Sequence, residues 1–171
     1  LVESIIHVFY AQPDGTLKAG EAIRTGRQPH YRAYADFNGD GKMDLAVSVA
    51  VDGAVEIYSG DGQGNFKLAT SLPSGINPHG VVAQDFNGDG KMDIAVTNRV
   101  SKDLAVFLGD GKGGFKARPR VKIGEDVISM TTREGKTKGR IDLMLVSAAT
   151  NRVLLLVGDG KGGFASPGRK I

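Results

Sequence analysis

Residues 36–47 read DFNGDGKMDLAV, and residues 85–96 read DFNGDGKMDIAV. The two stretches agree at 11 of 12 positions and lie 49 residues apart. The same offset relates the Gly-Asp-Gly turns that begin at Gly60, Gly109 and Gly158. A fixed repeat near 50 residues is typical of propellers and solenoids. The chain is therefore expected to consist of repeated units that pack on one another.

Each unit reads as four short antiparallel strands, expected in the first complete unit at residues 31–37, 44–50, 54–58 and 66–71. Asp-Gly and Gly-Asn pairs between the strands tolerate positive φ and favour hairpins. No segment sustains the 3.6-residue period of a helix. Four strands in 49 residues is the size of a propeller blade. The predicted fold class is all-β, a β-propeller built of four-stranded antiparallel blades.

The repeat divides the chain, a single partial propeller domain over residues 1–171, into about three and a half blades. The half blade, residues 1–26, contains only two outer strands, and full blades follow at 27–75, 76–124 and 125–171. A propeller needs at least four blades to close. Either further blades complete the ring or copies associate, for example as a homodimer. The fragment alternative is favoured, because two outer half blades do not complete each other.

Two loops between the first and second strands of a unit share the pattern D-x-N-x-D-G-x-x-D. Their carboxylates, amide oxygen and one backbone carbonyl can converge on a cation, and the glycine allows the bend. An all-oxygen set suits calcium better than magnesium, and it does not suit zinc. Two calcium sites are therefore predicted. Their ligands are Asp36, Asn38, Asp40, the Lys42 carbonyl and Asp44, and equally Asp85, Asn87, Asp89, the Lys91 carbonyl and Asp93.

Two other interpretations of these loops are rejected or disfavoured. An EF-hand places a bidentate Glu at position twelve, where this chain has Val47 and Val96, and its flanks are helices rather than strands. A pair of metal-free acidic turns is disfavoured, because three carboxylates so close in sequence repel one another unless a cation neutralises them.

The third loop has lost part of the pattern. Its register positions hold Glu134, Lys136, Lys138 and Asp142, so no calcium is expected there. Two interpretations remain open. An ammonium group of Lys136 or Lys138 takes the position of the metal and pairs with Glu134 and Asp142, or residues 131–139 have become a flexible loop.

The D-F-N-G-D-G-K-x-D-[LI]-A-V segment, followed by Gly-Asp-Gly-x-Gly-x-Phe, resembles the FG-GAP/VCBS repeats of integrin α-subunit propellers and of many secreted bacterial proteins. The resemblance covers essentially the whole chain and is strongest in two repeats. It implies a secreted or cell-surface protein that recognises protein or carbohydrate. The family's calcium ligands carry over to both intact loops but not to the third. The near-identical repeats and the absence of Asn-x-Ser/Thr favour the prokaryotic branch.

Composition sets further limits. The chain has no cysteine, and no apolar stretch approaches the roughly 20 residues of a membrane span. From Asp110 onward 13 Lys and Arg stand against 6 Asp and Glu, whereas 9 stand against 13 before it. A solvated basic surface is favoured over a polyanion-binding face. Aromatic and basic residues do not alternate, so no nucleic-acid partner is expected.

Other candidate residues carry weaker signals. His30 and His79 occupy equivalent positions, where a packing role is favoured over a ligand pocket. Four tyrosines could stack on a sugar, although most are expected in the core or rim: Tyr10, Tyr31, Tyr34 and Tyr58. Ligand-binding residues are therefore left unassigned.

The predicted function is an extracellular, calcium-stabilised binding or adhesion module for a protein or carbohydrate partner. No nucleophile–base pair occurs, and no paired carboxylates stand outside the calcium loops. The chain is accordingly expected not to be an enzyme. The alternatives are an accessory propeller domain of a secreted carbohydrate-active enzyme and a self-assembling repeat scaffold without a ligand.

Overall fold

The computed structural model describes residues 4–147, 149–165 and 169–170. Residues 1–3 and 171, which delimit the first and last predicted blades, lie outside them. Strands and turns make up the described residues, which contain no helix. Consequently, no helix in this part of the chain is long and apolar enough to cross a membrane.

The strands follow one another at the short intervals expected of a repeat. They are β1 (Ile5–Ile6), β2 (Phe9–Ala11), β3 (Leu17–Ala19), β4 (Ile23–Arg24), β5 (Pro29–Ala35), β6 (Asp44–Val49), β7 (Ala54–Gly60), β8 (Phe66–Pro73), β9 (Pro78–Gln84), β10 (Asp93–Asn98), β11 (Asp103–Gly109), β12 (Phe115–Ala117), β13 (Val121–Lys122), β14 (Ser129–Glu134), β15 (Ile141–Ser147), β16 (Arg152–Leu156) and β17 (Arg169–Lys170).

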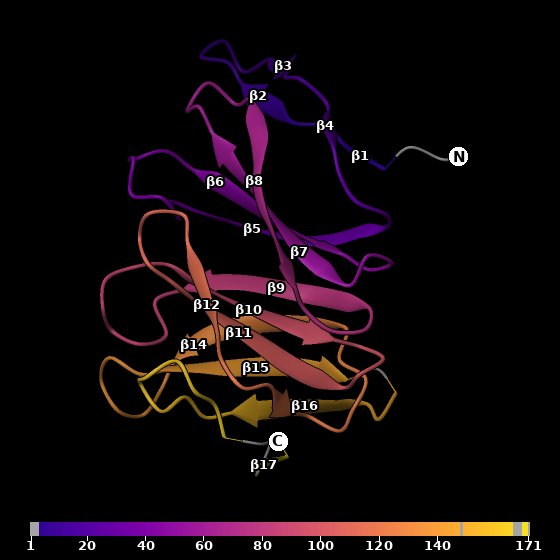
Figure 1. The fold of residues 1–171 in the computed structure, drawn as a ribbon, viewed down its shortest axis with the longest axis vertical. Helices are drawn as coiled ribbons and strands as arrows, with labels where there is room; N and C mark the ends of the chain where they lie inside the picture. The colour runs from indigo at the N-terminus through magenta and orange to yellow at the C-terminus, as the bar shows by residue number, and fades with distance from the viewer. Residues whose placement is uncertain (1–3, 148, 166–168, 171) are drawn as a thin grey trace.

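Three antiparallel sheets hold their strands in chain order, as propeller blades do. They are β5-β6-β7-β8, β9-β10-β11-β12 with β13 also paired to β11, and β14-β15-β16-β17. We call them blades two, three and four. Figure 1 shows them stacked from the N-terminal to the C-terminal end of the molecule. The predicted all-β, partial-propeller fold class is confirmed.

The half blade consists of two short ribbons, β1 paired with β4 and β2 paired with β3. An offset of 49 places Ile5 on Ala54 and Leu17 on Phe66, which begin β7 and β8. The ribbons are therefore the two outer strands of a blade.

The observed strands of blade two keep the expected order but differ at their ends: β6 ends at Val49, whereas β7 and β8 extend to Gly60 and Pro73. The first strand of blade two is Pro29–Ala35 rather than residues 31–37, because the side chain of Asp36 already accepts the amides of the following loop. In blade three, Pro119 separates β12 from β13. Proline has no N–H to donate to a sheet, so the outer strand that is continuous as β8 is interrupted there.

The hydrophobic cores lie between blades. All six residues of β6 are buried, because successive side chains point to opposite faces of a strand and both faces are covered. Leu45 and Val47 belong to the cluster that includes Ile23 of the half blade, whereas Ala46 belongs to the cluster with Val81 of blade three. Each blade therefore depends on its neighbours for burial.

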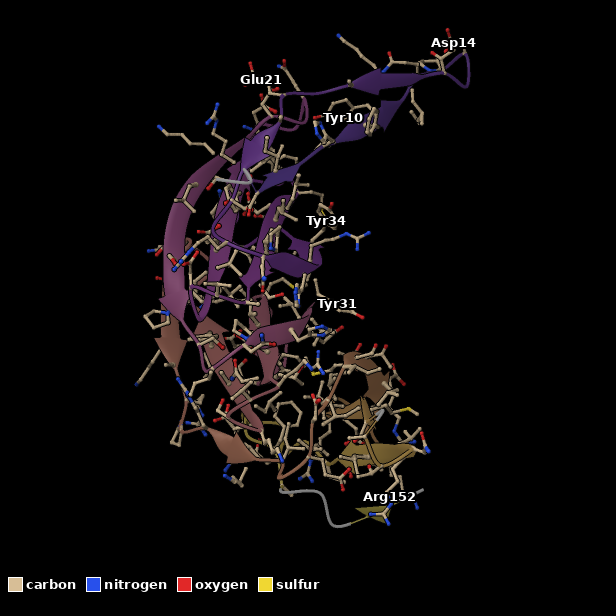
Figure 2. The ribbon with its side chains drawn as sticks, turned by 90° about the vertical axis from the view of Figure 1, so that its right-hand side faces the viewer. Tyr10, Asp14, Glu21, Tyr31, Tyr34 and Arg152 are labelled. Atoms are coloured by element: carbon tan, nitrogen blue, oxygen red, sulfur yellow. The ribbon has the colours of Figure 1, made fainter. Side chains whose placement is uncertain are left out.

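The inner strands β5, β9 and β14 lie next to one another. Seen from the side, the sheets form an open arc, and Tyr31 and Tyr34 of β5 lie on its inner side (Figure 2). This arrangement places the loops before β6 and β10 along one rim of the arc.

Candidate calcium-binding loops and neighbouring sites

The two acidic loops are built on the same hydrogen bonds. In the first loop, Asp36 Oδ1 accepts the amides of Gly39 and Asp40 at 2.7 and 3.2 Å, and Oδ2 accepts that of Gly41 at 2.8 Å. The three equivalent bonds to Asp85 have the same lengths. Desolvation opposes the effect, but these amides hold the pKa of Asp36 below its ordinary value. Each loop thus wraps its backbone amides around one carboxylate.

Glycine makes this wrapping possible. Gly41 and Gly90 have φ of +79° and +81°, as expected for the bend at position six. Gly39 and Gly88, with φ of +76° and +78°, form a second left-handed position in each loop. Residues other than glycine rarely adopt this backbone conformation.

Asn38 and Asp40 form the middle of the first predicted ligand set. The amide of Asp40 donates to Asn38 Oδ1, and the amide of Lys42 donates to Asp40 Oδ1, both at 2.9 Å. Asp40 Oδ2 also lies 3.3 Å from Asn38 Nδ2 and 3.9 Å from Lys42 Nζ. Local donors therefore partly compensate the charge of Asp40.

The last carboxylate of each loop is buried and has a structural role. Asp44 Oδ2 accepts the amide of Phe37 and Oδ1 accepts that of Gly60, both at 2.9 Å. A Cβ at Gly60 would lie 2.1 Å from the Met43 carbonyl oxygen, so only glycine fits there. Asp93 makes the equivalent bonds at 3.0 and 2.9 Å. This aspartate fastens the loop to the following Gly-Asp-Gly turn.

Whether calcium fits depends first on the chemistry of the donors. Every predicted donor is an oxygen, the type that calcium takes. Burial raises the pKa of Asp93, the amides of Gly109 and Phe86 oppose this, and Asp89 and Asp85 raise it further by charge repulsion. A bound cation would relieve that repulsion. The donor set therefore fits calcium by its chemistry.

The positions of the side chains add a limit. Among the described residues, no three Asp, Glu or His side chains gather closely enough to hold a metal. The structure places each predicted set on one loop but does not bring its carboxylates to one point. The Asn38 oxygen and the Lys42 carbonyl would have to complete the first set. The two calcium sites remain a prediction.

Both loops lie at blade junctions. The Phe37 carbonyl accepts the amide of Gly113 from blade three, and the Phe86 carbonyl accepts that of Gly162 from blade four, each at 3.1 Å. The Phe37 ring packs edge-on against Phe115 at 5.7 Å between centroids. Fixing either loop therefore also fixes the contact between two blades.

Beside the third loop, a cation supplied by strand β14 pairs with the buried aspartate. Arg133 Nη2 lies 3.0 Å from Asp142 Oδ2, and the amide of Gly158 donates to Asp142 Oδ1 at 3.1 Å. The pairing expected of Lys136 or Lys138 is therefore not the one observed. The guanidinium reaches the buried carboxylate from the adjacent strand β14, whereas both lysines are exposed in the loop. An alignment of the repeats could have indicated this pairing, because Arg133 stands where the other two repeats have the uncharged Ala35 and Gln84.

The two equivalent histidines, His30 of β5 and His79 of β9, contact each other across two neighbouring inner strands. The rings of His30 and His79 are 4.5 Å apart and perpendicular, and Tyr31 lies 4.8 Å from His79. The Nδ1 atom of His79 is 2.9 Å from the Ile128 carbonyl, which can only accept, so Nδ1 carries the proton and Nε2 the lone pair. Burial, and then the charge of His30, lower the pKa of His79.

The tyrosines divide between core and surface. Tyr58 is buried, and its hydroxyl donates to Glu56 at 2.6 Å, so burial followed by this bond raises its pKa. Tyr10 donates to the Gly64 carbonyl. Tyr34 is 48% exposed. Only some of the tyrosines therefore present a ring to solvent.

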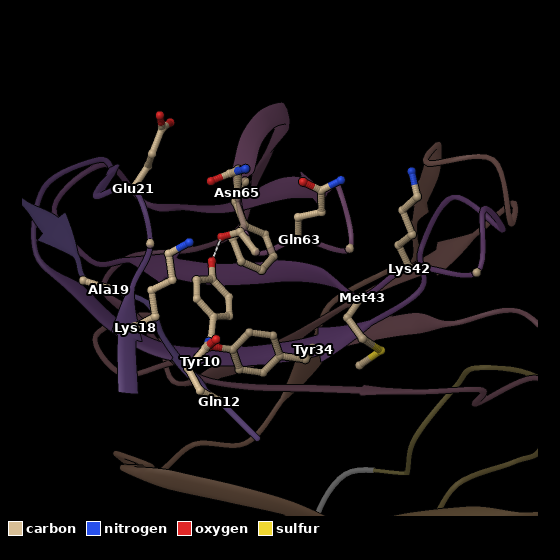
Figure 3. A pocket seen from close by; sticks show the side chains of 15 residues that line it. Tyr10, Gln12, Lys18, Ala19, Glu21, Tyr34, Lys42, Met43, Gln63 and Asn65 are labelled. Atoms are coloured by element: carbon tan, nitrogen blue, oxygen red, sulfur yellow. Dashed lines mark hydrogen bonds between the residues drawn. The ribbon is translucent and has the colours of Figure 1, made fainter. Parts of the chain in front are cut away.

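A cleft of about 1150 Å³ separates the half blade from blade two. Figure 3 shows Tyr10 and Tyr34 on its floor, with Gln63, Asn65 and Lys18 around them. Aromatic faces beside amide groups are the chemistry that a polar, partly apolar ligand requires. Sequence reasoning did not find this cleft, because its residues come from separate repeats.

The stacked blades and their repeated loops define the class of protein as a β-propeller repeat protein. The chain belongs to the FG-GAP-like repeat family, whose pattern matches residues 36–96 and 85–133. The resemblance recognised in the sequence is thereby confirmed. No curated protein matches the chain.

Solved structures with a similar fold share little sequence with this chain. A protein from Lactobacillus plantarum matches with a TM-score of 0.72 and 17% identity over 98% of this chain and 51% of its own. The Pseudomonas aeruginosa periplasmic gluconolactonase has a TM-score of 0.74 and 15% identity, with 98% and 48% covered. A functionally unknown protein from Desulfotomaculum acetoxidans has a TM-score of 0.68 and 14% identity, with 95% and 55% covered. The chain thus spans about half of each.

One of these findings corrects an expectation. The sequence led to the prediction that the chain is not an enzyme, and this prediction is wrong, because it was inferred from the absence of a catalytic motif. The gluconolactonase is an enzyme built on the same fold. At 15% identity the likeness concerns the fold alone. The absence of a recognisable catalytic pair in the sequence therefore cannot exclude activity.

Proposed function

We propose that this chain is part of an exported β-propeller module that recognises a protein or carbohydrate and is stabilised by two calcium ions. The observation that carries the calcium part is the pair of acidic loops with matching geometry. Three features of each loop favour binding of a cation: its oxygen donors, its glycines in the left-handed conformation, and carboxylates that repel one another in the absence of a cation. The periplasmic location stated for one similar structure supports an exported protein.

In this proposal, calcium has a structural role. The first ion is held by Asp36, Asn38, Asp40, the Lys42 carbonyl and Asp44, and the second by the equivalent residues of the second loop. Because each loop bonds to the next blade, each ion stabilises a blade junction. The neutralised loops then support the surfaces on which a partner binds.

Native mass spectrometry in calcium tests this assignment. We expect two ions per wild-type chain, one for Asp40→Asn, one for Asp89→Asn and none for the double variant. Lys136→Ala, in the third loop, is the matched control and should retain two. An unchanged ion count in the Asp40 and Asp89 variants would overturn the assignment.

The tyrosine cleft favours carbohydrate over protein as the partner. An exposed tyrosine ring beside two amide side chains offers both stacking and hydrogen bonding. Screening on a glycan array is expected to give binding that Tyr34→Ala weakens while the melting temperature stays unchanged. Retention of full glycan binding by Tyr34→Ala would remove the cleft from the proposal.

A second candidate function is hydrolysis of a sugar lactone. Two observations favour it: the likeness in fold to the gluconolactonase, and the contact between His30 and His79. In this pair, the unprotonated Nε2 of His79 could act as a base. Gluconolactone hydrolysis measured with wild type and with His79→Gln tests it. Activity that is lost in the variant would support the candidate, and a rate equal to the buffer rate would dismiss it.

The described blades form an open arc rather than a closed ring (Figure 2). Because the chain covers about half of each similar structure, we propose that further blades, rather than a second copy, complete the ring. Light scattering over a range of concentrations tests the two alternatives. A mass near 18.0 kDa supports further blades, and a constant doubled mass supports a homodimer or a self-assembling scaffold.

A further inference from the structure

The outer strand of blade three differs from that of blade two in charge. Arg118, Arg120 and Lys122 stand at the positions that Ala69, Ser71 and Pro73 hold in the preceding repeat. The backbone register is the same, because Val121 pairs with Leu104 as Leu72 pairs with Val55. The blade architecture therefore does not require positive charge there.

These side chains border a groove between blades three and four. It has a volume of about 650 Å³ and is bordered by Arg118, Arg120, Lys122 and, from blade four, Arg140. Pro119 and Val157 contribute apolar surface. All four cationic residues are exposed. The groove therefore combines shape with a concentration of positive charge.

Little negative charge offsets this basic groove. Arg120 Nη1 lies 3.6 Å from Asp103 Oδ2. Among the described residues of the lining, Asp159 is the only acidic one, and its Oδ1 already accepts the amides of Lys161 and Gly163 at 2.7 and 2.9 Å. Within the described part of the chain, Arg118, Lys122 and Arg140 have no carboxylate within 4.0 Å. Burial opposes the effect, but the charge of Arg118 helps to lower the pKa of Asp159. Lys122 and Arg140 are thus available to an external anion, and Arg118 is only partly compensated by Asp159.

We propose that the basic groove binds a linear acidic polysaccharide through its carboxylate or sulfate groups. Arg118, Arg120 and Lys122 recur at every second residue of one short segment and line the same groove as Arg140, so several cations face a single elongated ligand with repeated negative charges. Arginine guanidinium groups form paired hydrogen bonds with oxyanions. This inference rests on the proposed recognition function and adds the class of partner.

The lining disfavours a nucleic acid as the occupant. Proteins that bind single strands stack bases on exposed aromatic rings. Phe164 is the one aromatic residue in the described part of the lining, and it is buried and packs edge-on against Phe86, with 5.3 Å between the ring centroids. The groove therefore offers charge without a stacking surface.

Affinity electrophoresis and calorimetry with defined polysaccharides test the proposal. Heparin supplies sulfate groups, polygalacturonate supplies carboxylates alone, and dextran is the neutral control. We expect binding to at least one acidic chain, none to dextran, and weakening as salt rises. A preference between heparin and polygalacturonate identifies the recognised group.

The decisive variant is Arg118→Ala with Arg120→Ser, which installs the residues that blade two carries at these positions. Its affinity should fall at least about tenfold, since hydrogen bonds to charged groups are lost. The matched control, Lys67→Ala with Lys136→Ala, removes the same charge from exposed positions outside both the groove and the tyrosine cleft, and it should change affinity less than twofold. Equal affinity of the groove variant and wild type would overturn the proposal.

Two further outcomes also count against it. Absence of binding to both acidic chains would refute it, as would groove-dependent binding of single-stranded DNA with equal affinity. These outcomes are separable from failure of the proposed function. Binding of a neutral glycan at the tyrosine cleft would leave that function standing, and loss of calcium binding alone would leave the groove standing.

Discussion

The acidic loops and the third loop differ in the groups that stabilise a buried aspartate. All three contain a buried aspartate that accepts the amide of a Gly-Asp-Gly turn: Asp44, Asp93 and Asp142. In the acidic loops the second oxygen of this aspartate accepts a loop amide, and further carboxylates lie nearby. In the third loop Arg133 pairs with it instead. All three loops thus share the buried aspartate, whereas the groups that surround its second oxygen differ between the acidic loops and the third loop.

The largest expected effect comes from calcium itself. At free calcium 100 times the dissociation constant, each site should add about 2.7 kcal/mol to the free energy of unfolding. Thermal melts with and without a chelator should therefore differ strongly for wild type. The Asp40→Asn, Asp89→Asn double variant should melt at the same temperature in both conditions. A calcium-dependent rise in that double variant would place the ions elsewhere.

Asp142→Ala should cost about 2–4 kcal/mol, because it leaves the Arg133 guanidinium and the Gly158 amide without their partner. Urea unfolding measures this loss, which we expect to be the same with calcium and with chelator. Arg133→Gln, which installs the residue of blade three, keeps the aspartate and should cost only about 1 kcal/mol. A loss that depended on calcium would mean that the third loop also binds metal.

Rebuilding the acidic pattern in the third loop should add a calcium site. The variant combines Arg133→Gln, Glu134→Asp, Lys136→Asn, Thr137→Gly and Lys138→Asp, the residues of the second loop at these positions. Mass spectrometry should then count three ions. The free energy of unfolding in calcium should rise only modestly, because the variant loses the Arg133–Asp142 ion pair while it gains a calcium site. A count of two would show that more than the loop pattern is required.

The smallest effect concerns pH and lies outside the loops. Because burial lowers the pKa of His79 in the folded chain, the unfolded chain takes up that proton first as pH falls. This contribution to stability is complete above the unfolded pKa of about 6.5 and is lost as pH falls toward the lower folded pKa. Melts in chelator should show a decline there that His79→Gln reduces. An unchanged decline would assign it to other groups.

Much of the fold could be predicted because the repeat is nearly exact. The stretch from Asp36 to Val47 and its copy gave the strand order, the blade size and the positions of the bends, and the left-handed conformation of Gly41 and Gly90 follows from local chemistry. Strand ends were less predictable. Ala35 ends β5 because the side chain of Asp36 accepts loop amides, a competition that propensity does not reveal.

The sites divide in the same way. The sequence alone was enough to predict the oxygen donors of both acidic loops and to show the loss of the pattern in the third, because these depend on residue types at fixed spacing. Only the tertiary structure decided that Arg133 partners Asp142, that His30 meets His79, and that the basic groove and the tyrosine cleft exist. These features join side chains from different strands or blades. Their proximity is set by the twist and packing of whole sheets, which no local pattern encodes.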